Sequence, residues 1–123
     1  MAQSRWPTIL ASDRLGIKPL YLSDGADALR FASTLPALVA GGGVNTELDP
    51  VALNHYLSWH AVVPAPYTVL KGVRNLELGT VMIVTPDGKR TRETYWQADF
   101  RRGPERRDWT SEDWAQVVLD IRR

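Results

Sequence analysis

Short apolar runs in the first third of the chain predict β-strands. Thr8 to Ala11 and Ile17 to Leu22 are such runs, and Asp13 to Gly16 between them has the composition of a turn, so the three segments together predict a hairpin. Pro19 has no backbone N–H to donate to a neighbouring strand. The second strand should therefore lie at a sheet edge, or the nitrogen of Pro19 should point away from the neighbouring strand. After a turn-rich stretch, Ala28 to Ala32 predict another short strand.

Two helices are indicated by residues suited to cap them. Ser33 or Thr34 can cap a first helix that ends at Gly41, and its apolar face carries Leu35, Leu38 and Val39. Asp49 followed by Pro50 begins a second helix. Asp49 can cap it, and Pro50 in the first turn lacks only a backbone N–H that would have no intrahelical partner. Helical spacing then relates Leu53, Tyr56, Leu57 and His60, and we expect this helix to end before the sequence VVPAP.

The clearest hairpin is predicted around the sequence PDGK. Thr80 to Thr85 and Thr91 to Trp96 are β-rich, Pro86 sets the turn, and Gly88 can adopt a left-handed conformation. After this hairpin the composition changes to DFRRGPERRD over residues 99–108, which predicts a linker between domains.

The C-terminal residues predict one amphipathic helix. Thr110 and Asp113 form a capping-box pattern, and Trp109 can pack on Trp114 in the first turn. An isolated helix of this length is marginal in water, so it needs a surface on which to pack. Its apolar stripe consists of Trp114, Val117, Val118 and Ile121.

Composition narrows the class of protein. The chain has 123 residues, 44% apolar and 24% charged, which is typical of one globular domain, and its net charge is +1. It contains no cysteine, which excludes disulfides, thiolate metal sites and a cysteine nucleophile within these residues. There is no apolar run near the roughly 20 residues that cross a bilayer and no recognisable leader, so we expect a cytoplasmic protein without a membrane partner.

The candidate reactive residues favour structural roles. Gly41 to Gly43 follow a predicted helix, whereas a phosphate loop follows a strand and opens a helix. His55 and His60 are five residues apart, so on a helix they point away from each other rather than toward one metal ion. Ser58 has no third group to orient a base beside it. We therefore assign no catalytic, cofactor-binding or metal-ligating residue to this chain.

A basic span from Lys89 to Arg107 offers an alternative. Its arginines alternate with Tyr95, Trp96 and Phe100, a mixture that could bind phosphates and stack bases. Glu93, Asp99 and Glu105 interrupt the span, and alternate residues of a strand face opposite ways. A solvated hairpin and linker is the better interpretation, and we expect no nucleic-acid partner.

Four segments, in order, carry a resemblance to a known family: DRLGIKPLYL, ALRFASTLPAL, the long stretch from ELDP to TPDG, and ETYW. They resemble the glutamine-hydrolysing asparagine synthetases, which are class II amidotransferases. The wording HAVVPAP also resembles a subgroup that amidates N-acetylglutaminylglutamine. After the predicted strand that ends in FAS, many members of the family have an acidic residue and a lysine, whereas this sequence has Thr34 and Pro36.

The resemblance implies an α+β fold: the C-terminal half of an αββα glutaminase domain of the Ntn-hydrolase type. Residues 1–98 would belong to that domain, residues 99–108 to a linker, and residues 109–123 to the first helix of a synthetase domain. In the family an N-terminal cysteine hydrolyses glutamine, and a pyrophosphate loop uses ATP and Mg²⁺ to activate a carboxylate substrate. Neither motif matches any position here, so we expect an incomplete enzyme that is inactive alone.

Two other classes of function stay open. The chain could be a small interaction module that self-associates or complements a separate N-terminal half, because half of a sandwich leaves apolar faces and strand edges uncovered. The basic span leaves a nucleic-acid binder as the third hypothesis, which predicts binding that weakens steeply with salt.

Overall fold

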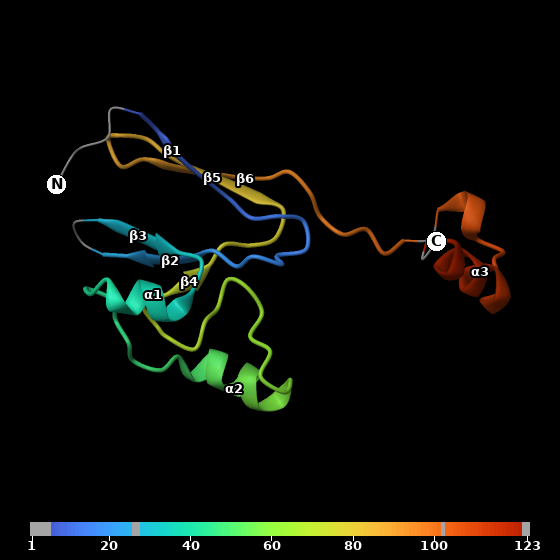
Figure 1. Cartoon of the computed structure of the whole chain (residues 1–123), viewed down its shortest axis with the longest axis horizontal. Helices are drawn as coiled ribbons and strands as arrows, with labels where there is room; N and C mark the ends of the chain where they lie inside the picture. The colour runs from blue at the N-terminus through green and yellow to red at the C-terminus, as the bar shows by residue number, and fades with distance from the viewer. Residues whose placement is uncertain (1–5, 26–27, 102, 122–123) are drawn as a thin grey trace.

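The computed structural model describes residues 6–25, 28–101 and 103–121. Two small antiparallel sheets lie face to face, with helices beyond one of them and a separate helix at the C-terminal end of a long connection (Figure 1). The chain is therefore an α+β protein, as predicted. None of the helices among the described residues is both long and apolar enough to cross a membrane.

The first sheet has the strand order β1-β5-β6. Strand β1 covers Thr8–Ala11, β5 covers Thr80–Val84 and β6 covers Arg90–Thr94. The hairpin predicted around PDGK is confirmed, because β5 and β6 pair antiparallel and Gly88 has a φ of 85°. Strand β6 ends two residues before the predicted end at Trp96.

The second sheet has the order β3-β2-β4. Strand β2 covers Tyr21–Asp24, β3 covers Leu29–Ala32 and β4 covers Arg74–Asn75. The strand expected over residues 28–32 is confirmed with its start moved by one position. Part of the turn-rich stretch before it, residues 26–27, lies outside the described residues, and β4 was not predicted.

The predicted hairpin of Thr8–Ala11 with Ile17–Leu22 is wrong. Strand β1 pairs with β5, β2 pairs with β3 and β4, and the two strands belong to different sheets. The reason lies in Asp13, whose carboxylate accepts backbone N–H bonds from Leu15, Ile17 and Lys18. These bonds hold the start of the expected strand in a turn, so the chain crosses between the sheets before it becomes extended at Tyr21.

The core lies between the two sheets. Leu10 and Met82 of the first sheet pack against Leu22 of the second sheet and against Leu76, which follows β4. All four residues are at most 5% exposed. Leu10 is paired with Met82, and both point inward. Successive side chains of a strand point to opposite faces, so the adjacent residues Ile9 and Ile83 point to the outer face of the first sheet.

Helix α1, Leu35–Ala40, packs on the second sheet through contacts with β2 and β3. Thr34 caps its start and Gly41 its end, as predicted, and Leu38 is its buried residue. The outer face of the second sheet therefore has a helix, whereas no helix in the described part of the chain contacts the first sheet (Figure 1).

Helix α2 covers Pro50–Ser58 and begins as predicted, with the Asp49 carboxylate accepting from the backbone nitrogens of Val51 and Ala52. The helix ends before VVPAP, but His60 lies beyond its end with a φ of 51°. Only Ala52 is buried, and the expected apolar face is exposed at Leu57, which is 72% accessible.

Helix α3, Ser111–Ile121, follows an extended segment and a 3₁₀ turn, η1, at Pro104–Arg106 (Figure 1). Its predicted capping box is confirmed, because Thr110 and Asp113 exchange hydrogen bonds. Trp109 and Trp114 pack edge to face with ring centroids 4.8 Å apart. No contact between α3 and another labelled helix or strand exists in the described residues, and Ile121 is 80% exposed. The assignment of residues 99–108 as an interdomain linker stays a prediction.

A candidate site between the two sheets

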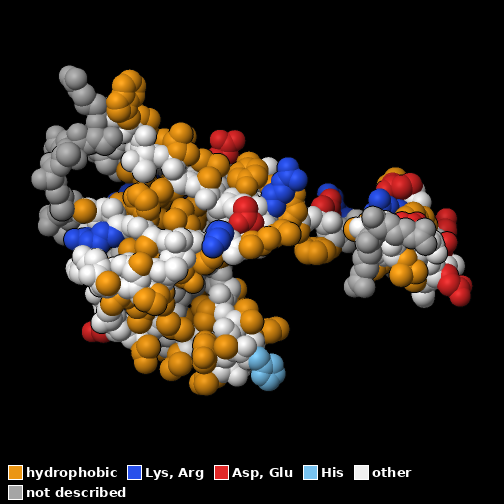
Figure 2. Space-filling model, viewed as in Figure 1, with side chains coloured by type: hydrophobic (Ala, Val, Ile, Leu, Met, Phe, Trp, Pro, Cys, Tyr) orange, Lys and Arg blue, Asp and Glu red, His pale blue; other side chains and the backbone are white. Residues whose placement is uncertain are grey.

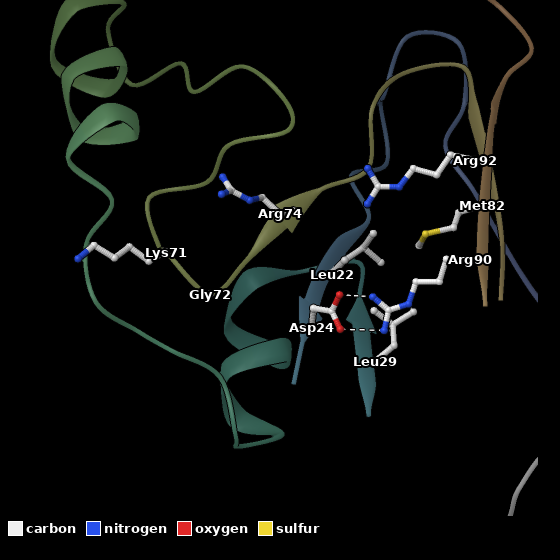
Figure 3. A pocket seen from close by; sticks show the side chains of 9 residues that line it. All are labelled: Leu22, Asp24, Leu29, Lys71, Gly72, Arg74, Met82, Arg90 and Arg92. Atoms are coloured by element: carbon white, nitrogen blue, oxygen red, sulfur yellow. Dashed lines mark hydrogen bonds and ion pairs between the residues drawn. The ribbon is translucent and has the colours of Figure 1, made fainter. Parts of the chain in front are cut away.

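A cleft of about 180 Å³ opens between the sheets beside the core. Leu22 and Met82 form its apolar floor, and Figure 3 shows Arg90 and Arg92 reaching into it from β6 toward the opposite sheet. Both arginines point inward because they are opposite Val84 and Met82 in the β5–β6 register. The remaining residues that line the cleft are Asp24, Leu29, Lys71, Gly72 and Arg74.

Asp24 and Arg90 connect the two sheets. Both guanidinium Nη atoms of Arg90 donate to the carboxylate of Asp24, with a distance of 2.8 Å between Nη2 and Oδ1 (Figure 3). This hydrogen bonding holds the pKa of Asp24 below its usual value, desolvation opposes the shift, and the charges of Arg90 and Arg92 reinforce it. The same bond raises the pKa of Arg90.

The other cations of the cleft have separate partners. Arg92 lies 3.8 Å from the carboxylate of Glu77, and Lys71 lies 3.1 Å from that of Glu47. Arg74 stacks on the ring of Tyr67 with its guanidinium carbon 5.3 Å from the centroid. In Figure 3 the Arg74 side chain points away from the Asp24–Arg90 pair. The cations therefore do not converge on one point that an anion would occupy.

The residues that line the cleft favour a structural role. They include no serine, threonine, histidine or cysteine, and the one carboxylate, Asp24, already accepts two bonds from Arg90. Of the groups that act as nucleophiles or general bases, this part of the described chain holds the amine of Lys71 and the carboxylate of Asp24, and both are ion-paired. The cleft is an ion-paired contact between the sheets.

The other residues considered from the sequence lie apart from this cleft. His55 is on α2 against the ring of Tyr67, with centroids 6.1 Å apart, while His60 follows the helix. Gly41 caps α1, and Gly42 and Gly43 have positive φ in the loop that follows. Within the described ranges no three His, Cys, Asp or Glu residues come together as a metal site would require. The prediction that the chain holds no catalytic or cofactor-binding residue stays a prediction.

The basic span is divided by the fold. Arg90 and Arg92 face the second sheet, Arg101 pairs with Asp99 at 2.8 Å, and Arg106 lies over the rings of Trp109 and Trp114. These residues therefore have different neighbours rather than one shared surface. Because side chains alternate along a strand, the predicted hairpin already indicates that Arg90 and Arg92 share one face. The sequence near Arg90 does not indicate that Asp24 is its partner, because the two residues are 66 positions apart.

Two face-to-face antiparallel sheets with a helix on one outer face define an α+β protein of the layered sandwich type. The chain belongs to the glutamine amidotransferase domain family, which matches residues 2–96. The match ends just beyond β6, so it covers both sheets together with α1 and α2.

Relatives narrow the family further. The chain is 37% identical over 91 residues to asparagine synthetase [glutamine-hydrolyzing] 1 of Bacillus subtilis (strain 168), covering 74% of this chain and 14% of that protein. It is 39% identical over 90 residues to a putative asparagine synthetase [glutamine-hydrolyzing] of Mycobacterium tuberculosis (strain ATCC 25618 / H37Rv), covering 67% of this chain and 14% of the relative. The predicted resemblance to glutamine-hydrolysing asparagine synthetases is confirmed, and the chain spans about 14% of their length.

Proposed function

We propose that these residues form the C-terminal part of a glutaminase domain in an amidotransferase of the asparagine synthetase kind. The observation that carries the proposal is the family match over residues 2–96, which coincides with the two packed sheets. In the intact protein glutamine would be hydrolysed to ammonia, which would amidate a carboxylate substrate activated by ATP and Mg²⁺. Either asparagine or an amidated dipeptide would be the product.

The arrangement of layers supports a four-layer αββα sandwich of the Ntn-hydrolase type. Helix α1 lies on the outer face of the second sheet, whereas Ile9 and Ile83 on the outer face of the first sheet are 64% and 38% exposed. Exposed apolar patches of this kind mark interaction surfaces. A second helical layer over this face would complete the sandwich.

The role of this chain in the reaction would be support rather than chemistry. With no cysteine in the sequence, it cannot form a thioester with glutamine, and Gly41 to Gly43 follow helix α1, whereas a loop for ATP phosphates follows a strand and opens a helix. The thiol, ATP and Mg²⁺ would therefore be held by residues outside these 123 positions. We expect the reaction to occur in the cytoplasm, where a catalytic thiol stays reduced.

The extended segment after β6 and the unpartnered helix α3 support the proposed division into domains. The apolar stripe of α3 leaves Val118 and Ile121 exposed by 54% and 80%. A helix with such a stripe is stabilised mainly by packing against another surface. We assign residues 99–108 to a linker and residues 109–123 to the first helix of the synthetase domain.

The second candidate is a non-catalytic interaction module. Apolar side chains gather over α2 and the loop after it (Figure 2), where Trp59 is 65% and Val62 is 59% exposed. Such a module would self-associate or bind a partner without releasing ammonia. Nucleic-acid binding is the least favoured alternative, because the arginines of the basic span have separate protein neighbours.

Reconstitution tests the proposed function. The purified 123-residue chain is assayed for ammonia release from glutamine, alone and after co-expression with the N-terminal segment of the Bacillus subtilis relative that precedes the matched region. We expect no release from either part alone and release from the pair. Ammonia release by the 123-residue chain alone, or a stable pair without activity, would contradict the proposal.

A further inference from the structure

A pocket of about 210 Å³ lies on the outer face of the second sheet, on the side where Figure 1 shows α1 and α2. Leu22 of β2 faces the core, so Tyr21 next to it points to the outer face, and the register places Asn75 of β4 opposite Tyr21. Leu35 at the start of α1 and Tyr56 of α2 form two further parts of the wall. The pocket shares no lining residue with the cleft between the sheets.

Among the described residues, no charged side chain lines this pocket, whereas three arginines and a lysine line the cleft between the sheets. An ion would lose its hydration in the pocket without gaining a partner of opposite charge. The pocket therefore favours an uncharged ligand over a free amino acid such as glutamine, which carries both an ammonium and a carboxylate group. The remaining residues of the wall are Ala61, Val63, Tyr67, Thr68 and Val69.

Three tyrosines of the pocket have hydroxyl groups that are free to bind a ligand. In the part of the chain that the structure describes, the hydroxyls of Tyr21, Tyr56 and Tyr67 have no hydrogen-bond partner. The hydroxyl of Tyr95, in contrast, donates to the carbonyl oxygen of Ser12 over 2.8 Å. A tyrosine hydroxyl can donate to a ligand carbonyl while the ring packs on an apolar body.

Asn75 has an acceptor that lacks a donor. Its Oδ1 is the one buried side-chain nitrogen or oxygen without a hydrogen-bond partner in the described ranges. Buried polar groups in folded proteins are almost always paired, because an unpaired group costs free energy. A ligand N–H that enters the pocket would supply the missing donor.

We propose that this pocket binds a small uncharged carboxamide with an apolar or aromatic body. The N–H of the carboxamide would donate to Oδ1 of Asn75, its carbonyl would accept from the hydroxyl of Tyr21, and its body would pack on the aliphatic side chains of the wall. A volume of about 210 Å³ suits a ligand smaller than a drug-sized molecule. This inference goes beyond the proposed function and does not depend on it, because it assigns no part of the glutamine or ATP chemistry to these residues.

Matched ligands test the class of molecule. Benzamide is titrated into the isotope-labelled 123-residue chain and followed by NMR, with acetophenone and benzoate as controls. Acetophenone keeps the carbonyl but has a methyl group in place of the amide nitrogen, and benzoate is charged. We expect saturable shifts at the pocket residues with benzamide, about fivefold weaker binding of acetophenone because one hydrogen bond is lost, and no saturable shifts with benzoate.

Variants locate the binding. Asn75→Leu removes the unpaired acceptor with little change in volume, so the urea midpoint of the free chain should stay the same or rise, while the preference for benzamide over acetophenone disappears. Tyr21→Phe removes one hydroxyl and should weaken benzamide binding about fivefold. Tyr95→Phe is the control, because that hydroxyl is bonded to Ser12 outside the pocket, and it should leave benzamide binding unchanged.

A pocket that holds only water would give no saturable shifts with benzamide, and this result would overturn the inference. Equal affinities for benzamide and acetophenone, or an unchanged benzamide affinity in Asn75→Leu, would overturn it as well. A lower urea midpoint for Asn75→Leu would mean that Oδ1 already has a partner in solution, which also contradicts the inference. None of these results bears on ammonia release by the reconstituted pair, so the proposed function is tested separately.

Discussion

Arg90 of β6 donates both of its Nη atoms to the carboxylate of Asp24 in β2, and this pair bridges the two sheets beside the core. The two residues are 66 positions apart in the sequence. The bond is bidentate, which is the strongest geometry for an arginine with a carboxylate. It joins strands that share no backbone hydrogen bond, so it contributes to how the sheets are held together.

The coupling between Asp24 and Arg90 should be measurable. The Asp24 side chain is 63% exposed and that of Arg90 is 33% exposed, so solvent screening limits their interaction to about 0.5–1 kcal/mol. A double-mutant cycle with Asp24→Asn and Arg90→Gln, followed by urea unfolding, measures this coupling. The Asp99–Arg101 pair is the control, because it lies within one segment and should show no coupling in unfolding. A coupling of zero for Asp24 and Arg90 would contradict their role between the sheets.

Asp24 should also make stability depend on pH. Its pKa in the folded chain is below the usual 3.8, so the folded state binds its proton less readily than the unfolded state does. The resulting stabilisation is present above about pH 4 and is lost as the pH falls through the lowered pKa. Asp13, Asp87, Asp99 and Asp113 also have lowered pKa values, and they contribute in the same direction.

The contribution of Asp24 is isolated by comparison with Asp24→Asn. The free energy of unfolding is measured between pH 2 and pH 7 for both proteins, and the difference between them should shrink on acidification below about pH 4. A difference that stays constant over this range would show that the pKa of Asp24 is the same in the folded and unfolded states.

Neighbouring residues on opposite faces of β5 provide a test of the core. Met82 is 1% exposed between the sheets, and Ile83 next to it is 38% exposed on the outer face. Met82→Ala should destabilise the chain by about 2–5 kcal/mol because it leaves a cavity in a closely packed site, whereas Ile83→Ala should cost about 1 kcal/mol or less. Chemical denaturation of the two variants measures both costs. Similar losses would mean that the outer face is buried as well as the core.

Local chemistry explains which elements could be predicted from sequence. Thr34, Asp49 and the Thr110–Asp113 pair cap helices through bonds to residues at most three positions away, so their signals are complete within a short window. The hairpin around Gly88 was predicted for the same reason. In contrast, Tyr21 pairs not only with Ala32 nearby but also with Asn75, and that second pairing is long-range, so no local pattern contains it.

The ion-paired cleft was only partly visible in the sequence. Arg90 and Arg92 belong to the basic span, and alternation in a strand places them on one face. Their partners, Asp24 and Glu77, are brought near by the packing of the sheets. At Asp13 the turn is predicted correctly, but the strand after it is not. The bonds from Ile17 and Lys18 to the Asp13 carboxylate keep these residues in the turn, so the strand begins only at Tyr21.

Gly79 links three parts of the fold, and its replacement should be the most damaging of the glycine changes. Its N–H donates to Asp13, its carbonyl accepts from Tyr95 at 2.8 Å, and its φ is 58°. A Cβ at this position would overlap the carbonyl oxygen of Trp96, which is backbone and cannot rotate away. Gly79→Ala should therefore cost roughly 3 kcal/mol from backbone strain and steric overlap together.

Gly42→Ala is the matched control for this prediction. Gly42 has a φ of 74°, but a Cβ there would meet no atom within 4 Å, so only the backbone strain of about 1–2 kcal/mol applies. Thermal and urea unfolding of the two variants separate strain from overlap. Equal destabilisation by the two substitutions would mean that the contact between Gly79 and Trp96 is not formed in solution, and β6 would then end without the two bonds that Gly79 accepts from Tyr95 and Trp96.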